Sequence, residues 1–227
     1  MASLKLNEPA ERFKEFYGKN IDQMPKLLGE GRTPLNVAGL MRRRLEVLIA
    51  SEEVKDAWWT NYFDTGDAVI YHPDGRFKVV LDAEPMRGIN PESELSSGAL
   101  VLPEGMYDKL NGEEFTRKEI RRYGIAEKLL TKEEAKFNPI WKALAGGNQA
   151  LLDAYVDAAF TKAKEGYGYD KLMSIWLSQT QEVTTGRLWC VSGLDCGFFS
   201  VAVVYDELCG SGGRLVGVRA GGALARE

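Results

Sequence analysis

The stretch that most constrains the fold is residues 66–82, GDAVIYHPDGRFKVVLD. Two β-prone runs, 68–71 and 77–81, flank the segment HPDGR. Within it, Pro73 presets its own φ, Asp74 can bond back to the main chain, and Gly75 tolerates a positive φ. The pattern predicts a β-hairpin whose turn carries His72, the only histidine of the chain.

A hairpin alone is marginally stable in water, so other segments must complete it. Further β-prone runs occur at 187–191, 198–205 and 214–218, with Gly-rich segments between them. We therefore predict an α+β fold, in which the 66–82 hairpin and C-terminal strands within 187–218 form one largely antiparallel sheet packed against a helical layer. A single domain over 1–227 is expected. The alternative is an N-terminal lobe of 1–115 followed by helices and a C-terminal meander in 116–227.

Four cap signals predict helix starts in the middle of the chain. Thr116 with Glu119, and Thr131 with Glu134, match the reciprocal capping pattern. Asn138 precedes a proline, and Asn148 precedes a broad apolar stripe. Elsewhere the spacing of apolar residues predicts helices over 7–17, from Thr33 onward to about 57, and again over 172–176, with a loop-like connector over 20–31.

Composition narrows the classes of function. The formal charge of −4 gives no overall field that attracts phosphate backbones, and Arg42, Arg43 and Arg44 fit the solvated face of a helix. No apolar run approaches the ~18 residues needed to span a bilayer, and the first residues lack the apolar core of a secretory signal. Three cysteines fit a reducing compartment. We expect a cytoplasmic protein with neither nucleic-acid nor membrane partners.

Cysteine chemistry provides one candidate site. Cys196 lies in a Gly-Leu-Asp-Cys-Gly segment whose small neighbours leave the sulfur approachable, His72 is the only imidazole that can activate it, and Asp195 adjoins it. The competing interpretation is a solvent-exposed hairpin histidine and a cysteine that packs as a small hydrophobe. No pair of cysteines has the short spacing of a structural zinc site, so we predict neither a metal nor another cofactor.

Three further residues are candidates for ligand binding. Arg214 ends the segment CGSGGR, whose main-chain N–H groups and guanidinium suit a phosphate or carboxylate, although the segment lacks the Lys-Ser/Thr ending of a nucleotide-binding loop. Trp189 belongs to a generous supply of aromatic residues that can line a pocket, and Arg187 lies near the same C-terminal turns.

No motif in the chain dictates a chemistry. The sequence favours a module that binds a small ligand or a protein partner. The alternative is a cysteine-dependent enzyme with its site among the C-terminal turns. An exposed edge strand near the C-terminus would be compatible with a homodimer.

Overall fold

The computed structural model describes residues 3–7, 11–179, 181–194, 200, 202–203 and 207–219. These residues form an α+β fold built on one mixed sheet of eleven strands. The strands are β1 (Phe13–Tyr17), β2 (Arg32–Pro34), β3 (Phe63–Tyr71), β4 (Arg76–Val80), β5 (Leu95–Ser96), β6 (Ala99–Val101), β7 (Glu113–Thr116), β8 (Ile175–Trp176), β9 (Thr185–Val191), β10 (Ala202–Val203) and β11 (Arg214–Arg219).

The predicted hairpin and the C-terminal strands share this sheet. β3 and β4 pair as an antiparallel hairpin, and β3 also pairs antiparallel with β9, with Val69 opposite Arg187. The pairs are largely antiparallel, as predicted, but β8–β10 and β3–β11 are parallel. A register shift between Asp64 and Ala68 interrupts the β3–β9 ladder near the start of β3.

Helices begin where the capping signals place them. Thr116 and Thr131 each form the complete capping box, and the side chains of Asn138 and Asn148 accept main-chain N–H groups at their helix starts. The helices are α1 (Asn20–Gly29), α2 (Val37–Glu46), the 3₁₀ turn η1 (Val47–Ile49), α3 (Glu52–Trp59), α4 (Glu84–Arg87), α5 (Met106–Lys109), α6 (Arg117–Tyr123), α7 (Lys132–Lys136), α8 (Pro139–Leu144) and α9 (Gln149–Tyr167).

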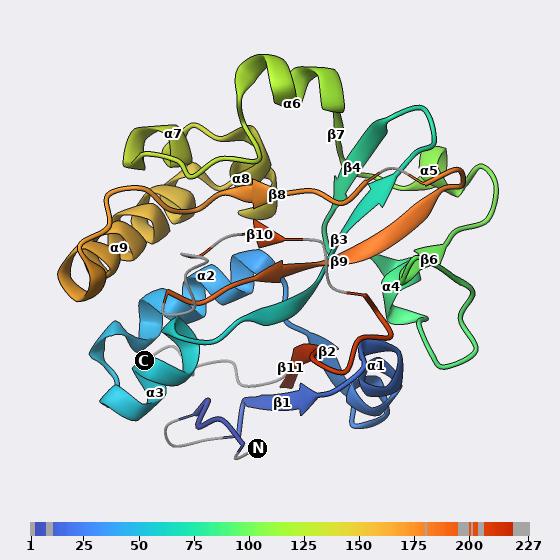
Figure 1. The fold of residues 1–227 in the computed structure, drawn as a ribbon. Helices are drawn as coiled ribbons and strands as arrows, with labels where there is room; N and C mark the ends of the chain where they lie inside the picture. Colours follow the sequence, from blue (N-terminus) through green and yellow to red (C-terminus); the bar gives the residue numbers. More distant parts are fainter. Residues whose placement is uncertain are drawn as a thin grey trace.

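Helices cover both faces of the central strands. Alternation along β3 sends Val69 and Tyr71 into a core shared with α2, α3, α8 and α9, whereas Ala68 and Ile70 enter a second core shared with α1, α4 and α5. Figure 1 shows α2, α8 and α9 on one side of β3 and β9, with α4 and α5 on the other. The sheet therefore contacts helices on two faces, where the sequence led us to expect one helical layer.

Several local predictions were wrong. Residues 13–17 form strand β1, not part of a helix, because they pair with β11 along its whole outer edge. The expected connector over 20–31 is instead α1, in which Ile21, Met24 and Leu27 bury one face despite Pro25. Residues 32–34 form β2, and the helix starts later, where Asn36 caps α2.

The run 172–176 contains strand β8 instead of a helix. Of the predicted strand 198–205, only residues 200, 202 and 203 are described, and Ala202–Val203 form β10. Whether the chain is one domain stays a prediction, although the shared sheet supports it.

Candidate functional site

Three loops meet at one end of the central strands. β9 runs antiparallel to β3 and β11 runs parallel to it, so the start of β3, the end of β9 and the start of β11 lie at the same end of the sheet. We call this surface the loop platform and define it as Tyr17, which pairs with Arg214, together with residues 60–62, residues 192–194 with Ser200, and residues 207–213. It includes the described part of the C-terminal turns among which the sequence hypothesis looked for a site, and that hypothesis stays a prediction.

Main-chain contacts hold the second platform loop against the end of α3 and against the first loop. The N–H of Leu194 donates to the carbonyl of Trp59 at 2.8 Å, and the N–H of Ser200 donates to the carbonyl of Gly193 at 3.0 Å. A Cβ atom at position 193 would lie 2.3 Å from the carbonyl carbon of Thr60, so only glycine permits this approach. The first two loops are therefore in van der Waals contact along their main chains.

A fully buried arginine, Arg44 on α2, holds the platform loops from the protein interior. Its guanidinium donates hydrogen bonds of 2.8–3.4 Å to five uncharged acceptors, which are the main-chain oxygens of Trp58, Asn61 and Ser192 and the hydroxyls of Tyr155 and Ser200. A buried charge is tolerated when hydrogen bonds replace its hydration. Arg44 thus links α3, α9 and two platform loops to α2.

Arg214 ties the third loop to the first. Its Nη1 donates to Oδ1 of Asn61 at 2.6 Å, and its main-chain N–H donates to Oδ2 of Asp64 at 2.7 Å. Its Nε lies 2.9 Å from a carboxylate oxygen of Glu15 on β1, and both side chains are buried. Since Asn61 also accepts from Arg44 through its main-chain oxygen, one residue connects both arginines.

The outer surface of the platform is aromatic. The guanidinium of Arg214 lies 5.3 Å from the ring centre of Tyr17 and 4.7 Å from that of Tyr62. Tyr17 is 39% exposed. The hydroxyl of Tyr62 donates to the carbonyl of Gly212 at 2.6 Å, and burial raises its pKa to about 12, so the phenol stays neutral. Ser211 and Gly212 are exposed beside it.

These groups suit recognition better than proton transfer. Tyrosine and arginine are enriched among the side chains that dominate protein interfaces, and tyrosine offers a large contact area with few rotatable bonds. In the part of the chain that is described, no three His, Cys, Asp or Glu side chains gather in a group able to hold a metal ion. Among the same residues, no helix is both long and apolar enough to cross a membrane.

The predicted ligand-binding residues lie on β9 and at the start of β11, and Arg187, opposite Val69, lies nearer the other end of the sheet. Arg187 and Trp189 are on β9, where Arg187 is 5% exposed and donates to the carbonyl of Ser97. Trp189 is fully buried, and its Nε1 has no hydrogen-bond acceptor among the described residues. Arg214 is 6% exposed and engaged as described above. Roles for these three residues in binding a ligand stay predictions.

His72 lies at the other end of β3. Its Nδ1 is 2.8 Å from Oδ1 of Asp74, and its ring centre is 4.9 Å from that of Tyr107. The nine residues of β3 separate it from the platform, a length of about 30 Å. Cys196 and Asp195 lie outside the described residues, so their association with His72 stays a prediction.

Sequence reasoning missed the residues that hold the platform together. Arg44 was interpreted with Arg42 and Arg43 as part of a solvated face, yet it follows Leu40 and Met41 at helical spacing and so falls on the buried face of α2. That spacing was the available signal. Asn61, Tyr17 and Tyr62 carry none, because their contacts with Gly212 and Arg214 join residues more than 100 positions apart.

Comparisons with known proteins place the fold. No family model matches the sequence, and no curated protein matches it. One solved structure that is similar is described in the words "Accommodation of massive sequence variation in Nanoarchaeota by the C-type lectin fold". The alignment has a TM-score of 0.67 and 17% sequence identity, and it covers 94% of this chain and 100% of that one. At this identity the likeness concerns architecture alone, and it shows that the chain has a C-type lectin-like fold.

Proposed function

We propose that the chain is a binding module that presents the loop platform to a protein or small-molecule partner. The observation that carries this proposal is the division of the platform into a buried support and an exposed surface. Arg44 has no exposed surface, whereas Tyr17, Ser211 and Gly212 face solvent. Side chains on the surface can therefore contact a partner without disturbing the groups that position the loops.

The structural neighbour supports the same division. Its C-type lectin fold is described as accommodating massive sequence variation, which requires a framework that persists while surface residues change. We extend this property to the present chain: the platform surface tolerates substitution, and the identity of its side chains sets the partner. Binding residues are commonly found on loops that a rigid scaffold positions.

A library screen followed by two variants tests the proposal. The purified protein is screened against an immobilised glycan panel and a displayed peptide library, and hits are measured again with the double variant Tyr17→Ser, Ser211→Arg. We expect at least a tenfold loss of affinity, because truncating one aromatic contact and placing a bulky side chain at the surface both act at the platform. The thermal midpoint should stay within about 2 °C of the parent value, because exposed substitutions change stability little.

A matched control is available on α9. Tyr167 is 43% exposed, close to the 39% of Tyr17, and lies outside the platform. Tyr167→Ser should leave every hit unchanged. Hits that bind the double variant and the parent equally well, or that respond to Tyr167→Ser instead, would overturn the assignment of binding to the platform.

A further inference from the structure

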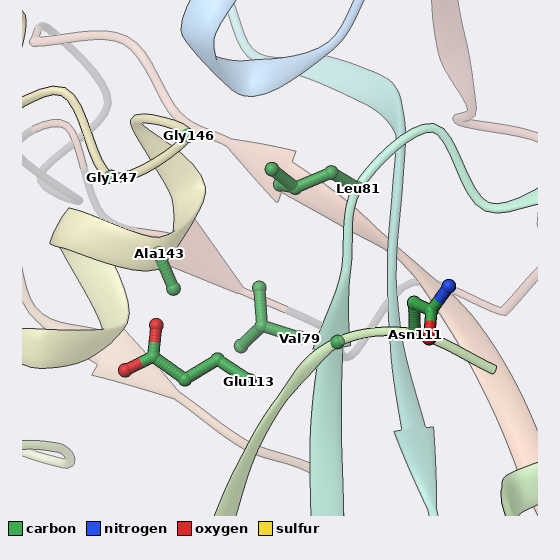
Figure 2. A pocket seen from close by; sticks show the side chains of 8 residues that line it. Val79, Leu81, Asn111, Glu113, Ala143, Gly146 and Gly147 are labelled. Atoms are coloured by element: carbon green, nitrogen blue, oxygen red, sulfur yellow. The ribbon is translucent and has the colours of Figure 1, made fainter.

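A hollow of about 380 Å³ lies away from the platform, between the edge of the sheet and α8. Its lining comes from β4 and the residue after it, from the start of β7, and from the C-terminal end of α8 with the following turn. Figure 2 shows these residues around the opening. The volume is within the ~300–1,000 Å³ range of small-ligand pockets.

The walls of this hollow combine an apolar surface with one charge. Val79, Leu81 and Ala143 supply aliphatic groups, and Leu81 is 41% exposed. Glu113 is the one charged residue of the lining, and its carboxylate has neither a hydrogen bond nor an ion pair with any described residue. In Figure 2 the Glu113 side chain extends toward α8, while the Asn111 amide lies to the right, away from α8.

Two glycine features keep the hollow in shape. A Cβ at Gly112 would lie 2.6 Å from the carbonyl oxygen of Val79, so this glycine lets the chain entering β7 approach β4 and fixes the position from which Glu113 projects. Gly147, with φ of +75°, has open space where a side chain would begin, which leaves the entrance clear. An aliphatic wall beside an unpaired carboxylate is complementary to an alkyl chain that ends in a cation.

We propose that this hollow binds a primary alkylammonium group, with its ammonium at Glu113 and its alkyl chain against Val79, Leu81 and Ala143. The inference does not depend on the function proposed for the loop platform. A free amine and the side chain of a lysine in a peptide share this chemistry, so the experiment includes both.

Titration of n-pentylammonium into protein with labelled Ala, Leu and Val methyl groups tests the site by NMR at low salt. We expect saturable shifts of the Val79, Leu81 and Ala143 methyl signals with a millimolar Kd. 1-Pentanol, of the same length without charge, should bind more weakly, and pentanoate should not shift these signals. Each methylene removed from the amine should weaken binding by up to about fourfold.

Two charge-removing variants locate the ammonium. Glu113→Gln should weaken n-pentylammonium about two- to fivefold, the range for an exposed ion pair, and leave 1-pentanol unchanged. Glu104→Gln removes an exposed carboxylate from a different hollow, the one beside His72 and Tyr107, and should have no effect. Thermal midpoints of both variants confirm that each is folded.

The second ligand identifies the natural source. If N-acetyl-lysine methylamide shifts the same methyl signals at least as strongly as n-pentylammonium, the site takes a lysine side chain, and if only the simple amine does so, it takes a free amine. Equal effects of Glu113→Gln and Glu104→Gln, equal binding of pentanol and pentylammonium, or shifts confined to other methyl groups would overturn the proposal. So would the absence of saturable shifts with both amines.

Discussion

The two ends of β3 are held in different ways. At its start, Arg44 and Arg214 are buried and bind oxygens of loops that are distant in sequence. At its end, Asp74 and Arg76 form an ion pair and Nδ1 of His72 lies 2.8 Å from Oδ1 of Asp74, and these side chains are 30–46% exposed. Exposed pairs contribute little and are screened by salt, whereas breaking buried networks costs several kcal/mol. The start of β3 is therefore held by buried hydrogen bonds, and its end is held by solvent-exposed contacts.

The largest contrast should appear in thiol labelling. Cys190 is 2% exposed on β9, beneath the platform, whereas Cys209 is partly exposed within it. Because Cys190 reacts only when the sheet opens, we expect it to label at least about a thousandfold more slowly than Cys209 at neutral pH. Mass spectrometry of a time course with iodoacetamide measures both rates.

The same time course tests the enzyme alternative. A thiol activated by His72 would make Cys196 label faster than Cys209 and slow down in His72→Ala. Equal rates for Cys196 and Cys209, with no effect of His72→Ala, would contradict a cysteine nucleophile. Comparable labelling of Cys190 and Cys209 would instead contradict a rigid support beneath the platform.

Substitution of Arg44 should give the largest loss of stability. Arg44→Met removes all five hydrogen bonds and leaves buried acceptors unsatisfied, so the free energy of unfolding should fall by about 3–5 kcal/mol. Arg42→Met, on the exposed side of the same helix, should change it by less than about 0.5 kcal/mol. Urea denaturation of both variants measures the difference, and similar losses would remove the distinction between the two faces of α2.

Asp67, in the middle of β3, should make stability depend on pH. Its carboxylate accepts the N–H groups of Val37 and Asp82 at 2.7 and 2.8 Å, but burial raises its pKa from 3.8 to about 6. The folded state therefore holds the proton more tightly than the unfolded state. The contribution of this group is fully present below pH 3.8 and is lost as the pH rises through 6.

The variant Asp67→Asn isolates that contribution. Between pH 4 and pH 7 the parent should lose up to about 3 kcal/mol more of its unfolding free energy than the variant, since one pKa unit corresponds to about 1.4 kcal/mol. Denaturation at a series of pH values measures both slopes. Parallel profiles would show that Asp67 has the same proton affinity in the folded and unfolded states.

The smallest effect is expected at the hairpin end. Arg76→Gln removes the contacts of Arg76 with Asp74 at 2.8 Å and Glu114 at 3.3 Å, and it should lower stability far less than Arg44→Met does, because exposed ion pairs contribute little. The loss should shrink further in 0.5 M salt. A cost as large as that of Arg44→Met would mean that the two ends of β3 are equally dependent on their arginines.

Local signals account for what the sequence predicted correctly. The HPDGR turn and the caps at Thr116, Thr131, Asn138 and Asn148 each involve residues within a few positions of one another, and all five appear in the structure. The segment 13–17 was misassigned because its partner, β11, lies about two hundred residues away. Strand pairing between residues so far apart overrides the local periodicity, and a short stretch of sequence does not reveal it.

The candidate site was predictable only in outline. The segment CGSGGR was singled out, and its described residues 209–214 do lie at the end of the sheet where the platform forms. The network through Arg44 and Asn61 was not foreseen, because it depends on which loops the sheet topology brings together. His72 was grouped with the C-terminal turns because it is the only histidine of the chain, and β3 carries it to the end of the sheet away from residues 207–213.

The chemistry of the acceptors around Arg44 has one more implication. Three of the five are carbonyls of the peptide chain, at positions 58, 61 and 192, and every amino acid brings such an oxygen. Those three bonds therefore do not depend on which side chain is attached at positions 58, 61 and 192. Substitutions at the exposed surface of the loop platform leave these bonds in place, because their acceptors belong to the main chain.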